Sequence, residues 1–224
     1  MNDAPMLLPP IFTAHLFPKL EASLIELLRS LSAEDLERRT LAPKWNVKEV
    51  AAHLLDTQVR KLAAAHRGFT AENSRPLPSA ELLALVNSFN AEGVRRYAWL
   101  SPDELISRME AASRESAEYH QALDPFAAAM FPVSWAGEER SANWFDTARE
   151  FTERWHHQQQ IRVAVNQPGI MTRELYHPVL DCFLRALPHT YRDIPAKPGT
   201  LAKFHVSGEC GGSWHLFRKD VGWA

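Results

Sequence analysis

Two adjacent histidines, His156 and His157, lie inside the segment EFTERWHHQQQIR (150–162), which otherwise has the pattern of an ordinary helix. Residues four apart share one face of an α-helix, so this spacing pairs Glu153 with His157. Both of these side chains carry groups that bind metals. The spacing therefore predicts that Glu153 and His157 belong to a metal site. His156 lies about 100° round the helix and forms, with Gln160, either a supporting pair or a surface pair.

A carboxylate and one imidazole leave a metal site incomplete, because catalytic zinc takes three protein ligands and keeps one position open. The missing ligand must come from another helix, and His53 is the main candidate. His53 lies on an apolar helix face, so its imidazole needs a polar partner. It is either a ligand or a core histidine bonded to a neighbour. His120 is a further candidate. His66 lies roughly 20 Å along the helix from His53 and cannot share its metal.

The elements that must position these residues are helices, predicted from apolar residues at helical spacing and from N-capping residues. Their expected ranges are about 18–32, 46–68, 79–100, 101–123, 143–165 and 173–187. Ser32–Asp35 is expected to end the first helix, and Trp45 and Trp144 to anchor two helix starts in the core. The irregular connection 124–142 includes Ser134–Gly137, which we expect to lie over the site because long connections are often functional.

The C-terminal part has a different pattern. Alternating apolar residues in 201–206, Leu201 among them, and in 214–216 flank a glycine-rich turn and predict a β-hairpin. An isolated hairpin is only marginally stable, so it must pack on the helices or pair with a partner chain. We therefore expect a helical metal-binding domain over residues 1–168 and a small helix-and-hairpin appendage over residues 169–224.

The composition, 46% hydrophobic and 23% charged residues, is that of a globular protein. A net charge of −2 argues against nucleic-acid binding, which needs a basic face. No segment approaches the ~20 apolar residues that span a bilayer, and the N-terminus lacks the basic region of a signal peptide. Cys182 and Cys210 lack metal-ligand spacing and are expected to be free thiols. These features predict a cytoplasmic protein that binds neither nucleic acid nor membranes.

The segment WNVKEVAAHL (45–54) resembles the W-x-V-x-x-(V/L)-x-x-H-L signature of the DinB-like superfamily. Within that superfamily, it is most similar to the mycothiol-dependent maleylpyruvate isomerase N-terminal type. The resemblance covers about residues 15–165. It implies a mainly α fold, a DinB-like four-helix bundle that binds a metal, followed by a small C-terminal α/β appendage.

The resemblance also implies a ligand set for a divalent metal. The implied ligands are His53, Glu153 and His157. Zinc is expected, and nickel, iron and manganese also suit histidine and carboxylate ligands. The tandem histidines leave His156 as an alternative to His157. Asp56 and Arg60 lie one or two turns beyond His53. They either line the mouth of the pocket or form a salt bridge. His156 is a further candidate for lining the pocket.

The activity implied by the resemblance is that of a thiol transferase or a maleylpyruvate-isomerase-like isomerase, acting on a small-molecule substrate. An open metal position deprotonates a bound thiol, and the thiolate is the nucleophile. Cys182 and Cys210 lie outside the bundle, which favours a low-molecular-weight thiol cofactor over an internal thiol. Bound water would instead give a hydrolase, and a closed site a non-catalytic, stress-associated binding module. In a further interpretation, the bundle is a scaffold for a homodimer with the hairpin paired across chains.

Overall fold

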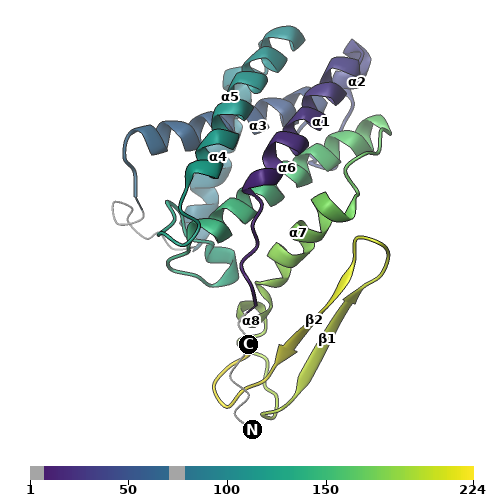
Figure 1. The fold of residues 1–224 in the computed structure, drawn as a ribbon. Coiled ribbons are helices and arrows are strands. Elements are labelled where there is room, and N and C mark those ends of the chain that lie inside the picture. The colour runs from purple at the N-terminus through teal and green to yellow at the C-terminus, as the bar shows by residue number, and fades with distance from the viewer. Residues whose placement is uncertain (1–7, 71–78) are drawn as a thin grey trace.

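The computed structural model describes residues 8–70 and 79–224, and within them it is mainly helical with one two-stranded sheet near the C-terminus (Figure 1). Its elements are η1 (Ala14–Leu16), α1 (Phe17–Ser30), α2 (Ala33–Glu37), α3 (Val47–His66), α4 (Ser79–Tyr97), α5 (Pro102–Ala122), η3 (Ser134–Ala136), α6 (Asn143–Val165), α7 (Arg173–Leu184), α8 (Leu187–Thr190), β1 (Leu201–Val206) and β2 (Gly212–Phe217). The predicted fold class, a mainly α bundle with a small α/β appendage, is confirmed. No helix in the described ranges is long and apolar enough to cross a membrane.

The start of α3 is fixed by local hydrogen bonds. The Asn46 side chain accepts from the backbone N–H of Glu49, and the Glu49 carboxylate accepts from the backbone N–H of Asn46. This reciprocal pair satisfies backbone donors that the first helical turn leaves free. Ser32 and Asp35 make the same arrangement at the start of α2. The expectation that Ser32–Asp35 only ends the first helix is therefore incomplete, because these residues also begin a short helix that leads toward α3.

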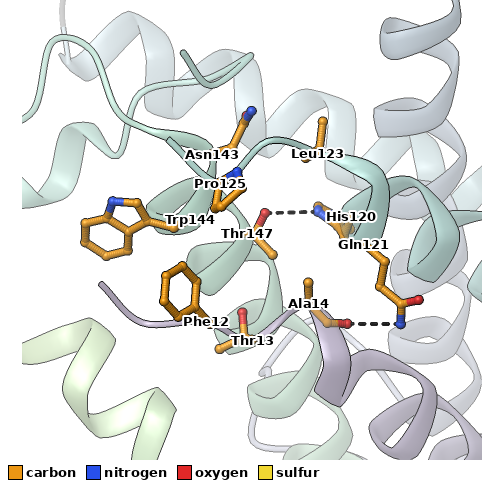
Figure 2. A pocket seen from close by; sticks show the side chains of 10 residues that line it. All are labelled: Phe12, Thr13, Ala14, His120, Gln121, Leu123, Pro125, Asn143, Trp144 and Thr147. Atoms are coloured by element: carbon orange, nitrogen blue, oxygen red, sulfur yellow. Dashed lines mark hydrogen bonds between the residues drawn. The ribbon is translucent and has the colours of Figure 1, made fainter. Parts of the chain in front are cut away.

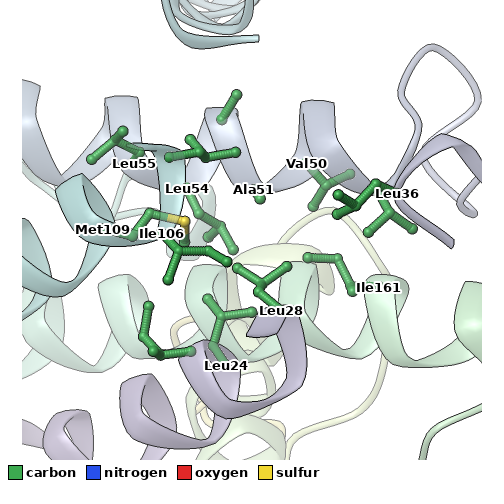
Figure 3. Close-up of a cluster of buried hydrophobic side chains, with 14 of the residues drawn as sticks. Leu24, Leu28, Leu36, Val50, Ala51, Leu54, Leu55, Ile106, Met109 and Ile161 are labelled. Atoms are coloured by element: carbon green, nitrogen blue, oxygen red, sulfur yellow. The ribbon is translucent and has the colours of Figure 1, made fainter. Parts of the chain in front are cut away.

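The main hydrophobic core lies between α1, α3, α5 and α6 (Figure 3). Leu24 and Leu28 of α1 meet Leu54 of α3 and Met109 of α5, all with at most 3% of their surface exposed. Ile161 brings the C-terminal half of α6 into the same core and is fully buried. Burial of each such side chain contributes about 1.5–3 kcal/mol to folding. The core thus holds α3 and α6 side by side, so that residues about 100 positions apart in the sequence, such as His53 and Glu153, can meet.

The β-hairpin packs on α7 of the same chain, one of the two arrangements expected for it. The Trp214 indole stacks on the His177 ring at 5.6 Å and donates a hydrogen bond to Asp181. In the register, Leu201 pairs with Phe217, and both are about half exposed, at 49% and 48%. Leu201 therefore does not share the partly buried face of its strand, contrary to expectation, because alternate residues point to opposite faces. The division of the chain at residue 168 stays a prediction.

The long connection before α6 lies near the start of that helix. Trp135 packs against Phe145 at 6.1 Å and Phe183 at 5.7 Å. Glu153 is eight residues beyond Phe145, roughly 12 Å along the helix axis. The expectation that Ser134–Gly137 covers the site is therefore wrong: this segment contacts α7 and α8 instead.

Candidate metal centre

The three predicted ligands meet where α3 crosses α6. Nε2 of His53 and Nε2 of His157 each lie 3.2 Å from the same oxygen, Oε1 of Glu153. One potential ligand atom from each residue lies within 4.8 Å of the other two. Across residues 8–70 and 79–224, no other group of three or more histidine, cysteine, aspartate or glutamate side chains gathers in this way.

His53 is enclosed by its surroundings on α3. Its neighbours Ala52 and Leu54 are completely buried, and His53 itself is only 1% exposed. The Trp45 ring lies 4.7 Å from the His53 ring and 6.2 Å from the His157 ring. Trp45 precedes the Asn46 cap, so the chain reversal that begins α3 also sets this indole beside the histidines. Trp45 is thus a wall of the site and not only an anchor of the helix start.

The charge states of the three residues are coupled through Glu153. Partial burial would raise the pKa of Glu153, but hydrogen bonds from His157 and His53 outweigh it and hold this pKa well below the usual range. Burial lowers the pKa of His53, and the bond to Glu153 only partly offsets that. For His157, the bonds to Glu153 and Gln160 exceed the effect of burial and raise the pKa. The group therefore presents an ionised carboxylate between two imidazoles that hold protons with different affinity.

The two adjacent histidines have different environments. His157 is partly buried and faces Glu153, whereas His156 is exposed and its ring centroid lies 5.9 Å from that of His157. Gln160 joins them: its Oε1 lies 2.8 Å from Nδ1 of His157, and its Nε2 lies 3.1 Å from Nε2 of His156. The structure therefore brings His157, and not His156, beside Glu153.

The residues present fit a divalent metal. Two imidazoles and one glutamate form an attested ligand set for catalytic zinc, with bonds near 2.0–2.2 Å. A tetrahedral ion at such distances separates its ligand atoms by about 3.4 Å. The 3.2 Å contacts at Glu153 are close to that separation. The Glu153 side chain is 43% exposed, so the group has an open side toward solvent.

Asp56 and Arg60 lie beside the site but form an ion pair of their own. The Arg60 guanidinium donates to the buried Asp56 carboxylate and to Asn90 of α4. Gly93 allows α4 to approach, because a Cβ at this position would lie 2.2 Å from an Asp56 oxygen. The salt-bridge interpretation of Asp56 and Arg60 thus agrees with the structure, and the pair links α3 to α4.

The α3–α6 contact contains a second polar group that we did not predict. Nζ of Lys61 lies 2.6 Å from Asp146 and 3.4 Å from Glu150, and Arg149 also contacts both carboxylates. Lys61 and Asp146 are almost fully buried. A signal for this network is present in the sequence, because Asp146, Glu150 and Glu153 share one face of α6. With one Lys and one Arg to two carboxylates, the network is balanced in charge.

His120, the further candidate, lies elsewhere. It borders a cavity of about 170 Å³ between residues 12–14, the end of α5 and the start of α6 (Figure 2). Its Nδ1 lies 3.3 Å from the Thr147 hydroxyl, and its ring stacks on Phe17 at 4.7 Å. Among the described side chains, its Nε2 has no hydrogen-bond partner. No carboxylate lines this cavity, so His120 is a packed core histidine and does not join the three-residue group.

Comparison with known families shows where the chain belongs. The family described as "Mycothiol maleylpyruvate isomerase N-terminal domain" matches residues 17–162, most of the chain. The chain belongs to this family. The matched segment contains α1 to α5 and nearly all of α6, including His53, Glu153 and His157. The α7 helix and the hairpin lie beyond it.

A solved structure shows that the fold extends past the matched segment. A crystal structure of a point mutant of the mycothiol-dependent maleylpyruvate isomerase is similar with a TM-score of 0.56 at 12% sequence identity. The similarity covers 84% of this chain and 73% of that chain. At this identity it bears on the fold alone. No curated protein matches the sequence.

Proposed function

We propose that this member of the family is a divalent-metal-dependent enzyme that uses a low-molecular-weight thiol, either as a thiol transferase or as an isomerase of the maleylpyruvate type. In this proposal His53, Glu153 and His157 hold the metal. The observation that carries it is the convergence of three ligand atoms within 4.8 Å from helices separated by about 100 residues. The relative of similar fold is itself a mycothiol-dependent isomerase.

The distribution of cysteines supports an external thiol. Cys182 is completely buried beside Ile11, Val133 and Phe145, and burial raises the pKa of its thiol to about 12. Such a thiol is almost entirely protonated at neutral pH and is a poor nucleophile. Cys210 lies in the hairpin turn, where its Sγ contacts the backbone of Met171. Neither cysteine contacts the three-residue group, so the nucleophilic sulfur would have to come from a small molecule.

The protein's own residues would bind and orient the reactants. A bound divalent metal would supply a Lewis acid that lowers the pKa of a coordinated thiol. Glu153 stays ionised over the physiological pH range and would balance the metal's charge. Trp45 forms an apolar wall that would exclude water on one side of His53 and His157. The exposed edge of Glu153 marks the side from which a thiol and a substrate would enter.

Metal content and thiol binding test this proposal separately. Protein purified without a nickel column is expected to contain about one zinc, nickel, iron or manganese ion per chain, and anomalous scattering would locate it. Cobalt-substituted protein is then titrated with mycothiol, and a sulfur-to-cobalt absorption band is the expected result. A chain that binds no metal contradicts the whole proposal. A metal-loaded chain without that band, but with hydrolytic activity, would contradict the thiol-dependent part and favour the hydrolase.

A further inference from the structure

The hydrogen bonds around His157 continue beyond the nitrogen that faces Glu153. Oε1 of Gln160 lies 2.8 Å from Nδ1 of His157. A carbonyl oxygen can only accept, so Nδ1 of His157 carries the proton in this contact. Nε2, the atom that lies 3.2 Å from Glu153, is then the nitrogen that can give up its proton and bind a metal. The hydrogen bond at Nδ1 thus leaves Nε2 as the atom of His157 that can bind a metal.

The Gln160 amide serves His157 in only one of its two orientations. If the amide were reversed, its NH2 group would face Nδ1 of His157 and favour a ring that keeps its proton on Nε2, which could not bind a metal through that nitrogen. His156 opposes this reversal. Its Nε2 lies 3.1 Å from the Gln160 NH2 group and accepts a hydrogen bond in the observed orientation. The exposed histidine therefore determines the direction of the amide, and the amide determines the protonation of His157.

The arrangement depends on spacing within one helix. Gln160 lies four residues beyond His156 and three beyond His157 on α6, so the helix itself brings its side chain to both. His53 has no comparable support: its buried Nδ1 has no hydrogen-bond partner among the described residues. Packing against Trp45 and His157 orients the His53 ring instead. The two imidazoles are therefore positioned by different means.

We propose that Gln160 and His156 form a hydrogen-bonded support that fixes the His157 ring with Nε2 at the metal position. This inference rests on the proposed function, in which His157 is a ligand. A group that bonds the far nitrogen of a ligating histidine orients the ring, and its loss typically lowers metal affinity 10–100-fold. Gln160 and His156 are positioning residues and do not touch the metal. The tandem histidines thus have two roles, one as ligand and one as support.

Three substitutions separate this support from simple helix packing. Gln160→Leu removes both hydrogen bonds at similar volume. Gln160→Glu keeps an acceptor for Nδ1 of His157 and removes the donor to His156. Gln159→Leu is the matched control, since Gln159 is the adjacent residue and bonds neither histidine among the described side chains. Two quantities are measured: the zinc dissociation constant by competition with a chelator, and the solvent-exchange rate of the His157 Nδ1 proton by NMR, in metal-free and zinc-loaded protein.

Gln160→Leu is expected to weaken zinc binding about 10- to 100-fold and to speed exchange of the Nδ1 proton. Gln160→Glu is expected to keep the zinc dissociation constant and the exchange rate of the Nδ1 proton near the wild-type values. His156→Phe should give a smaller loss of affinity, below about 10-fold. Wild-type affinity and slow exchange in Gln160→Leu would overturn the inference, as would equal losses in the Leu and Glu variants. If the unaltered chain binds no zinc, the proposed function fails, and exchange in the metal-free protein still decides the role of Gln160.

Discussion

His53 and His120 are alike in burial and packing, yet only one of them belongs to a candidate site. They are 1% and 2% exposed, and each ring lies 4.7 Å from an aromatic ring, Trp45 for His53 and Phe17 for His120. Each has one buried ring nitrogen without a partner among the described residues. His53 differs because its other nitrogen meets a carboxylate and a second imidazole, whereas His120 meets only the Thr147 hydroxyl.

This difference shows that burial alone does not make a histidine a ligand. Burial lowers the pKa of both residues, so neither the pKa nor the exposed fraction separates them. What separates them is the helix opposite. The α6 residues that face His53 are Glu153 and His157, whereas the α6 residue that faces His120 is Thr147. A candidate metal site is therefore defined by the convergence of ligating groups.

The same substitution at both histidines gives the largest contrast. His53→Phe is expected to reduce zinc affinity by more than about 100-fold, because loss of a ligand exceeds the effect of a supporting group. His120→Phe keeps a ring against Phe17 and is expected to leave zinc affinity within about twofold. Competition with a chelator measures both. Equal affinities in the two variants would remove His53 from the site, and a large loss in His120→Phe would show that the two regions are linked.

Lys61 tests whether the polar residues between the two histidines serve the metal or the fold. Lys61→Met leaves Asp146 and Glu150 buried with only Arg149 as their partner, so we expect the free energy of unfolding to fall by about 3–5 kcal/mol. Zinc affinity should stay within about threefold. Urea denaturation measures stability, and Lys219→Met, at an exposed lysine, is expected to change it by at most about 0.5 kcal/mol. A large loss of zinc affinity in a folded Lys61→Met protein would contradict this separation.

Sequence patterns predicted the helices well because their signals are local. Asn46 and Glu49 mark the start of α3, and the i, i+4 rule pairs Glu153 with His157 on α6. The partner of that pair is not a local property. The apolar face of its helix made His53 the main candidate and left His120 a further one, and only the resemblance to a family implied His53 as a ligand. The structure then supplied what spacing lacks, which is the identity of the residues facing each histidine.

Two features escaped prediction for a related reason. Lys61 lies eight residues beyond His53, and its burial depends on carboxylates about 85 residues away. The segment Ser134–Gly137 has no periodic pattern, so its place against α7 and α8 follows only from tertiary packing. The role of Gln160 could be predicted only in part. Its proximity to His156 and His157 follows from helix spacing, but its orientation requires the hydrogen bonds of the folded protein.

Zinc binding should stabilise the native chain through the His53 region alone. A ligand that binds only the folded state adds about 2.7 kcal/mol at 100 times its dissociation constant. We expect this increase in urea denaturation of the unaltered protein and of His120→Phe, and no increase in His53→Phe. A chelator should abolish the gain. If zinc stabilised His53→Phe by the same amount, the ion would be bound outside the three-residue group.

The pH dependence of stability gives the smallest effect and concerns His120. Burial, with a further contribution from Arg154, holds the pKa of His120 well below its usual value near 6.5. As pH falls through about 6.5, the unfolded chain gains a proton at His120 that the native chain does not. Stability from this residue is therefore complete above about pH 6.5, and the loss below it approaches about 1.4 kcal/mol per pH unit. In metal-free protein, His120→Phe should lose less stability between pH 6.5 and 5 than the unaltered chain. His157, whose pKa is raised, acts above that range: its stabilisation is complete below about pH 6.5 and is lost as pH rises, so His157→Phe should lose less stability than the unaltered chain between pH 6.5 and 8. Equal slopes for all three proteins would mean that these buried rings titrate as they do in the unfolded chain.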